Sequence, residues 1–146
     1  MLLETTRKLI GIPSTNPMGK PLDSLFESRM TEFLVEFLSQ RQVEHEVLEV
    51  SPRRANVLAF LPGTTDHLLL ADAHQDTVPV TNMTIDPFAA TVENGRIAGR
   101  GACDVKGSLA VLLCLIDQLA RQELKNRSQL LFSFTCDEEY GETGIL

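Results

Sequence analysis

Two short apolar segments constrain the fold of this chain more than any other feature. Residues 67–73 and 130–135 are rich in leucine and phenylalanine, and turn-forming or charged residues bound them. Within the first, Leu68 to Ala71 shows no alternation of apolar and polar side chains, a pattern typical of a strand covered on both faces. We therefore predict that both segments are buried strands.

Turn signals divide much of the remaining chain into helices and further strands. Residues 43–50 and 55–61 read as extended segments separated by a Ser-Pro turn, and Asn-Gly at 94–95 indicates a hairpin. Residues 1–10 and 109–120 have the apolar spacing of helices. The chain therefore alternates between strands and helices.

A further helix is predicted in the first third of the chain, with Asp23 or Ser24 as its N-cap. Its apolar side chains recur at the spacing of one helical face: Phe26, Met30, Phe33, Leu34, Phe37 and Leu38. Strands that alternate with helices indicate the α/β fold class, in which helices cover both faces of a layered sheet.

Composition excludes several classes of partner. The chain has 146 residues and a net charge of −7, which argues against binding to nucleic acid or to an anionic membrane. No apolar run approaches the ~20 residues of a membrane span, and the N-terminus lacks a secretory signal. Cys103, Cys114 and Cys136 have no CxxC spacing, so we expect free thiols, the last two buried, and a cytoplasmic protein.

Potential ligands follow each apolar segment directly. His74 and Asp76 come after the first, residues 137–139 (Asp-Glu-Glu) come after the second, and Asp104 lies in a Gly-rich loop before a helix. Sites in open α/β sheets form at the carboxyl ends of strands, so these three groups are expected at one edge of the sheet. Imidazole and carboxylate groups together suit Zn²⁺, Mn²⁺ or Co²⁺.

The spacing of the residues within these groups indicates which side chains can bind a metal and which can orient a ligand or act as a base. His74 and Asp76 are two residues apart and point to the same side of an extended segment, so the Asp76 carboxylate can accept a hydrogen bond from the ring N–H that faces away from a metal. Glu138 and Glu139 are adjacent and point to different sides. One can bind a metal while the other acts as a general base.

Each signal taken singly has a simpler interpretation. An isolated His after a strand is commonly structural, the Asp-Glu-Glu run could be a solvated loop, and Asp104 could cap the helix that follows it. The glycines at 99 and 101 hint at a phosphate-binding loop. However, the third Gly of that motif falls at Asp104, and Lys106 precedes Gly107, so nucleotide binding is rejected.

Three longer strings resolve the ambiguity, because together they resemble the M20 metallopeptidase family. The strings are LLLADAHQDTVP, GRGACDVKG and DEEYGETG, in the family's order and on the expected elements. The family includes acetylornithine deacetylase, succinyl-diaminopimelate desuccinylase, aminoacylase and glutamate carboxypeptidase. The resemblance also covers the segments at 10–17 and 86–88. The chain departs at Ala73, where many members have Gly, and at Cys103, a small-residue position in relatives.

The resemblance implies a role for each site residue. His74 would bind one metal, Asp104 would bridge two, and Glu139 would bind the other. Asp76 would orient His74, and Glu138 would be the general base of a metal-activated water. The implied cofactors are two divalent ions, with zinc first and cobalt or manganese as alternatives.

The implied reaction is hydrolysis of an amide bond in an N-acyl amino acid, as in a deacetylase, or in a short peptide. A carboxypeptidase or dipeptidase of the same family, and a non-catalytic binding relative, are the alternatives. The family also often has a cis peptide after the bridging Asp, here between Asp104 and Val105.

Parts of the family's pattern are not found before the chain ends at Leu146: a further acidic ligand, a distal His, and an inserted domain that binds substrate and pairs subunits. His45 and His67 precede the site and do not replace the distal His. We therefore expect residues 1–146 to be the N-terminal portion of an α/β/α zinc-peptidase-like catalytic domain with a mixed, largely buried sheet. The complete protein would be a homodimer, and this portion alone would be inactive.

Overall fold

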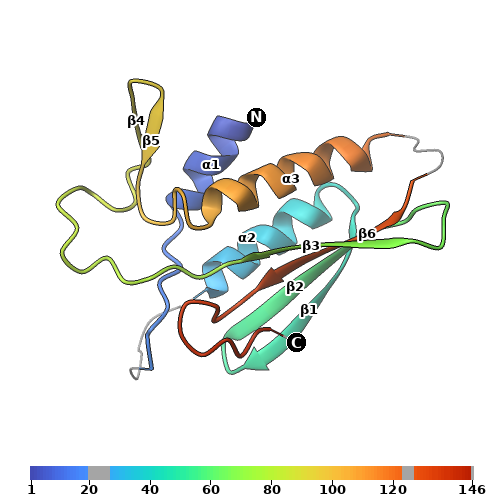
Figure 1. Cartoon of the computed structure of the whole chain (residues 1–146), viewed down its shortest axis with the longest axis horizontal. Coiled ribbons are helices and arrows are strands. Elements are labelled where there is room, and N and C mark those ends of the chain that lie inside the picture. The colour runs from blue at the N-terminus through green and yellow to red at the C-terminus, as the bar shows by residue number, and fades with distance from the viewer. Residues whose placement is uncertain (20–26, 123–126, 146) are drawn as a thin grey trace.

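Helices and strands follow one another along the chain much as the apolar pattern predicts (Figure 1). The computed structural model describes residues 1–19, 27–122 and 127–145. Within them the elements are α1 (Leu2–Ile10), α2 (Ser28–Ser39), β1 (Glu44–Ser51), β2 (Arg54–Leu61), β3 (Leu68–His74), β4 (Thr91–Glu93), β5 (Arg96–Ala98), α3 (Lys106–Ala120) and β6 (Gln129–Thr135).

Four strands form a mixed sheet in the order β1-β2-β6-β3. The β1–β2 and β2–β6 pairs are antiparallel, whereas β3 and β6 are parallel. In the parallel pair His74 lies opposite Thr135, so the carboxyl ends of β3 and β6 lie side by side. The predicted α/β fold class is confirmed, and this topology brings the two polar segments that follow these strands to one edge.

The core lies between the helices and one face of the sheet. α2 contacts β1 and β2, α3 contacts β2 and β3, and α1 packs on α3. Every second residue of β2 and β6 points into this core and is buried: Val57, Ala59, Leu61, Leu130, Phe132 and Phe134. Close packing on this face holds β3 and β6 in place, and it therefore fixes the positions of their carboxyl ends.

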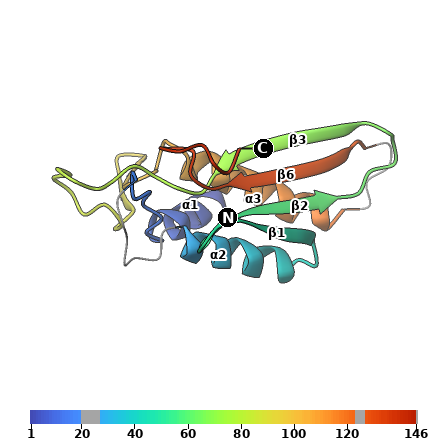
Figure 2. The same cartoon turned by 90° about the horizontal axis from the view of Figure 1, so that it is seen from below.

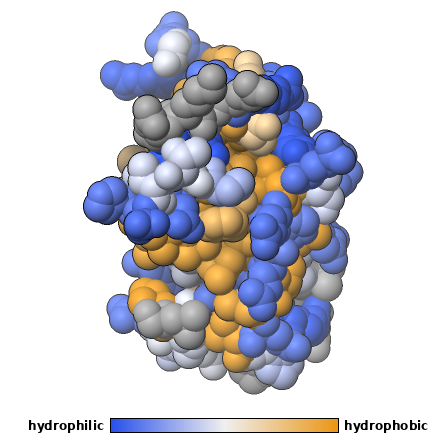
Figure 3. Space-filling view, turned by 90° about the vertical axis from the view of Figure 1, so that its right-hand side faces the viewer, coloured by the Kyte–Doolittle hydropathy of each residue, from blue (hydrophilic) through white to orange (hydrophobic). Residues whose placement is uncertain are grey.

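The second face of the sheet differs from the prediction. Leu68, Leu69 and Leu70 are 58 to 60% exposed, so the expectation that this segment is covered on both faces is wrong. β3 is the edge strand of the described sheet, and the helices that touch the sheet in the described ranges, α2 and α3, both pack on its core face (Figure 2). Figure 3 shows a band of hydrophobic residues open to the viewer at the end of the molecule where β3 begins.

Smaller predictions had mixed outcomes. The hairpin at Asn94 and Gly95 joins β4 to β5 and is confirmed, because both residues have the positive φ that such a turn requires. Asp23, Ser24 and Phe26 lie outside the described residues. The three cysteines are free, Cys136 is buried, Cys114 is half-buried and Cys103 is exposed. No helix among the described residues is long and apolar enough to cross a membrane.

Candidate metal centre

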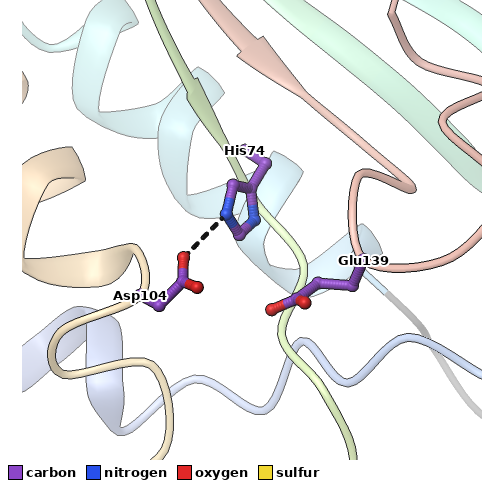
Figure 4. Close-up of side chains that lie close together, drawn as sticks. All are labelled: His74, Asp104 and Glu139. Atoms are coloured by element: carbon purple, nitrogen blue, oxygen red, sulfur yellow. Dashed lines mark hydrogen bonds and ion pairs between the residues drawn. The ribbon is translucent and has the colours of Figure 1, made fainter.

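Three side chains from separate segments meet beyond the carboxyl ends of β3 and β6 (Figure 4). His74 is the last residue of β3, Asp104 lies in the loop before α3, and Glu139 lies in the loop after β6. One potential ligand atom from each falls within 4.8 Å of the other two. The Nε2 atom of His74 is 3.1 Å from Oδ1 of Asp104. The structure therefore brings together the three residues predicted to bind metal.

Asp76 fixes the orientation of the His74 ring through its backbone carbonyl oxygen and not, as predicted, through its carboxylate. Nδ1 lies 2.9 Å from the main-chain carbonyl oxygen of Asp76 and 3.6 Å from its carboxylate. Since a carbonyl oxygen only accepts, Nδ1 carries the proton, and the expected hydrogen bond to the carboxylate is replaced by one to the backbone. Nε2 is thereby directed at Asp104 and at Glu138, whose carboxylate is 3.7 Å away.

The charged form of His74 is strongly favoured in this setting. Burial alone would lower its pKa, but its interactions with Asp76, and then with Asp104, outweigh that effect and raise the pKa to about 9. A proton on Nε2 occupies the position that a cation would take between His74 and Asp104. The surroundings of the ring therefore favour positive charge at Nε2.

Asp76 is the point at which the two strand ends are tied together. Its carboxylate is fully buried and accepts hydrogen bonds from the backbone N–H groups of Glu138 and Glu139, each at 3.1 Å. Burial would raise the pKa of Asp76, but its interaction with the nearby His74 ring and hydrogen bonds from Asn16 and these two backbone groups lower it. Asp76 thus stays ionised and holds the loop that carries both glutamates.

The two glutamates differ in their surroundings. The Glu138 side chain is 45% exposed and reaches towards His74 from the open side of the site. The Glu139 carboxylate accepts a hydrogen bond from the N–H of Val78 at 3.2 Å. Burial, and then the neighbouring Asp104 carboxylate, raise the pKa of Glu139, although the charge of His74 opposes this. Crowded carboxylates of this kind are stabilised by a cation.

Asp104 does not serve the simpler role of a helix cap. α3 begins at Lys106 with Val105 as its N-cap, and no side chain caps it. The Asp104 side chain is 77% exposed and points at His74. The peptide bond between Asp104 and Val105 is cis, as the resemblance implied.

The donor set fits a divalent metal. One imidazole nitrogen and two carboxylate oxygens are the ligand types that Zn²⁺ takes in catalytic sites, where three protein ligands leave a position for water or substrate. Within residues 1–19, 27–122 and 127–145 no other group of three such side chains meets this closely. Three ligands suit one ion, whereas two ions bridged by Asp104 require more.

Sequence reasoning missed the residues that support this centre. Asn16 is buried and its side-chain amide joins Asp76 to Asp137, which are 60 and 121 residues away. Lys106 is buried, donates to the carbonyl oxygen of Ile12 at 2.6 Å, and has its pKa lowered to about 7 by burial. Contacts of such long range leave no periodic signal, although the segment at 10–17 was part of the family resemblance.

Comparison with known protein families places these observations in context. A family model described as "Peptidase family M20/M25/M40" matches residues 70–146, just over half of the chain. Two similar curated proteins are succinyl-diaminopimelate desuccinylases. That of Beijerinckia indica is 34% identical over 140 residues, and that of Buchnera aphidicola is 29% identical over 144 residues. Both alignments cover 94% of this chain, which spans about a third of each relative, 35% and 34%.

Solved structures of M20 family proteins are also similar to this chain. An M20 family metallo-carboxypeptidase from Sulfolobus solfataricus is 28% identical, with a TM-score of 0.71 over 97% of this chain and 30% of its own. The YXEP protein of Bacillus subtilis, described as a dinuclear metal binding peptidase from the M20 family, is 27% identical, with a TM-score of 0.59 over 94% of this chain and 35% of its own. Human carnosine dipeptidase 1 shares the fold, with a TM-score of 0.83 at 20% identity over 99% of this chain and 33% of its own.

Proposed function

Because this chain belongs to peptidase family M20/M25/M40, we propose that it forms the metal-binding part of a hydrolase that cleaves the amide bond of an N-acyl amino acid. The observation that carries the proposal is the convergence of His74, Asp104 and Glu139 beside Glu138, at the carboxyl ends of two parallel strands. The same edge is where α/β sheets place their sites.

Each residue is given a role that its surroundings support. His74 would bind one ion through Nε2, because its Nδ1 proton is committed to the Asp76 carbonyl. Asp104, whose exposed carboxylate faces His74, would bridge two ions, and Glu139 would bind the second. Asp76 would hold the ring of His74 and the loop of the two glutamates in register. Zinc fits this mixed nitrogen and oxygen set, as do cobalt and manganese.

Glu138 is proposed as the general base. When bound, the two metal ions would lower the pKa of a water molecule and polarise the scissile carbonyl. The Glu138 carboxylate would take the proton from that water and return it to the leaving amine. Its position supports this role, because the side chain is partly exposed and lies on the open side of the site, close to His74 but outside the group of three ligands.

An N-acyl amino acid is favoured over a peptide because the curated relatives described above are desuccinylases, which remove an acyl group. The names of two of the solved structures, a metallo-carboxypeptidase and a dipeptidase, keep a carboxypeptidase or dipeptidase activity as the second candidate. A non-catalytic binding relative is the third. The presence of all five site residues argues against it, because a degenerate site usually loses at least one.

We further propose that residues 1–146 are the N-terminal portion of a catalytic domain in a longer protein, since the relatives are about three times as long. The homodimer that the family resemblance implies is part of the same proposal. The further acidic ligand, the distal His and the inserted domain would come from that longer protein. The 146-residue chain alone would then bind metal weakly and hydrolyse nothing detectable. Turnover of an N-acetyl amino acid by the purified chain with Zn²⁺ or Co²⁺ would contradict this part of the proposal.

The test of the proposed function is Glu138→Gln in the longer protein. The amide is nearly the same size as the carboxylate but cannot accept the proton, so turnover should fall by about 10²- to 10⁴-fold while metal content stays unchanged. Metal content measured beside kcat separates the base from a ligand. Near-normal turnover in the variant would remove Glu138 from the mechanism.

A further inference from the structure

Asn16 lies outside the group of predicted ligands, yet it is as buried as the core. It belongs to the loop after α1 and is 1% exposed, and two backbone hydrogen bonds fix this loop to the segment that follows His74. The N–H of Asn16 donates to the carbonyl of Thr77 at 2.8 Å, and the N–H of Thr77 donates to that of Ser14 at 3.0 Å. The main chain of Asn16 is therefore set by the same segment that carries the site.

The side-chain amide of Asn16 has a defined orientation. Its Oδ1 accepts a hydrogen bond from the N–H of Met18 at 2.9 Å, so Nδ2 must point the other way. Nδ2 donates to Oδ2 of Asp76 at 2.6 Å and to Oδ1 of Asp137 at 2.9 Å. Both hydrogens of the amide are thereby used on two buried carboxylates of the same charge.

These two carboxylates have different anchors. Asp137 is held by Arg54 at 2.8 Å and by the hydroxyl of Thr143 at 2.6 Å, and Arg54 is also paired with the fully buried Glu27. This end of the arrangement belongs to β2 and to the loop after β6. The Asp76 carboxylate, in contrast, is held by the amide of Asn16 and by the backbone N–H groups of Glu138 and Glu139.

The position of Asp76 determines those of the predicted metal-binding and catalytic groups through hydrogen bonds. Its carboxylate receives the N–H groups of Glu138 and Glu139, and its carbonyl receives the ring of His74. A rotation of the Asp76 side chain would therefore shift the backbone that carries the proposed base and one proposed ligand.

We propose that Asn16 is a positioning residue of the metal centre, which clamps Asp76 to the rigid Asp137–Arg54 pair and so sets the loop of Glu138 and Glu139 relative to His74. This inference rests on the proposed function. A neutral amide with two N–H donors suits this point, because a third carboxylate would repel both aspartates and an apolar side chain would remove one hydrogen bond from each.

The test compares Asn16→Ala with Asp117→Asn in the longer protein. Asp117 is also buried and hydrogen-bonded, but it lies near the far end of α3 among arginines, so its substitution weakens buried hydrogen bonds without touching the site. We expect Asn16→Ala to weaken Co²⁺ binding by about 10- to 100-fold, to alter the visible absorption of bound Co²⁺, and to lower kcat more than it changes KM. Asp117→Asn should lower Tm but leave all three unchanged.

The outcomes separate the two proposals. If the wild-type protein binds no metal and hydrolyses no amide, the proposed function fails. If the wild type is active and Asn16→Ala keeps its Co²⁺ affinity, spectrum and kcat, the positioning role is overturned and Asn16 is only a fold contact. Should Asn16→Ala not fold, Asn16→Ser, which keeps one donor, is judged by the same three measurements: a weakened, altered site supports the role, and an unchanged one overturns it.

Discussion

The two ends of α3 carry clusters of charged side chains that are balanced in opposite ways. Near its C-terminus, Asp117 is buried between Arg41 at 2.5 Å and Arg121 at 2.7 Å, so the protein itself supplies the positive charge. Before its N-terminus, Asp104 faces His74 in a cluster that also holds Asp76, Glu138 and Glu139. Four carboxylates share one imidazole there.

The first cluster is a structural ion pair, whereas the second has an excess of negative charge. Arginines keep the pKa of Asp117 below its ordinary value, which is the behaviour of a structural ion pair. In the other cluster the interactions of His74 with Asp76 and Asp104 outweigh burial and raise its pKa to about 9, so a proton on this one imidazole offsets part of the negative charge. A divalent cation would offset it better, and this contrast can be tested at both ends.

The largest effect is expected from His74→Ala. Removing the only imidazole from the acidic cluster removes a proposed ligand, so Co²⁺ affinity of the longer protein should fall by more than about a hundredfold. Isothermal titration with Co²⁺ measures this. His45→Ala is the control, because His45 lies in β1, away from the acidic cluster, and its ring contacts the carbonyl of Val43 and, at 3.5 Å, the hydroxyl of Ser39. Equal affinities in the two variants would break the comparison.

The second prediction concerns pH. His74 holds its proton below a pKa of about 9, and a metal at Nε2 must replace that proton. Apparent metal affinity should therefore rise about tenfold for each pH unit up to about 9 and then level off. Titrations between pH 6 and 10 in a non-coordinating buffer test this. An affinity that is flat over this range would contradict the assignment of His74 as a ligand in competition with a proton.

The arginine-balanced end should respond at acid pH instead. The folded-state pKa of Asp117 is lowered, so its stabilising contribution is present above the unfolded value of about 3.9 and is lost as pH falls through the folded value. Comparing the free energy of unfolding of wild type and Asp117→Asn across pH isolates this contribution. The difference between them should shrink only at acid pH and should not change near pH 9.

Much of the fold and of the site follows from local sequence signals. Strand and helix positions are predicted by apolar periodicity. The placement of His74 and Glu139 at one edge follows from the parallel pairing of β3 with β6, and the loop before α3 brings Asp104 to them. The exposure of Leu68 to Leu70 could not be predicted, because a leucine run reports the preference for burial and not whether a neighbour covers it.

The supporting contacts of the site were also beyond local patterns. Asn16 reaches Asp76 and Asp137 across 60 and 121 residues, and no spacing rule connects them. The ring of His74 bonds to the backbone of Asp76 and not to its carboxylate, a choice between two atoms of one residue that spacing cannot distinguish. Residue types and strand order predict which groups meet, while the three-dimensional packing decides which atoms bond.

A further prediction concerns how much a bound metal ion at the acidic cluster contributes to the free energy of unfolding. At a free Zn²⁺ concentration of 100 times the dissociation constant, the longer protein should gain about 2.7 kcal/mol in its free energy of unfolding. Asp104→Asn, which leaves the side chain exposed and similar in size but removes its charge, should lose most of this gain. Chemical denaturation with and without Zn²⁺ provides both values. An equal gain in the variant would place the metal elsewhere.

The smallest effect is expected from Asp117→Asn. The substitution removes the negative charge between Arg41 and Arg121 but keeps an amide oxygen that can accept from them, and both arginines reach solvent, with side chains 20% and 70% exposed. The free energy of unfolding should therefore fall by only about 1–2 kcal/mol. Co²⁺ affinity should be unchanged, since the altered residue is 11 positions along α3 from Lys106, the first residue of the helix, or about 16 Å. A loss of metal binding here would show that the two ends are coupled.

The most direct measurement of the central claim is a crystal structure of the longer protein with zinc, in which anomalous scattering locates the ions. The proposal predicts an ion about 2.0–2.2 Å from Nε2 of His74 and from a carboxylate oxygen of Asp104, and a second ion within the same range of Glu139 and the other Asp104 oxygen. Anomalous peaks that lie elsewhere, with His74 still protonated and bonded to Asp104, would contradict the account.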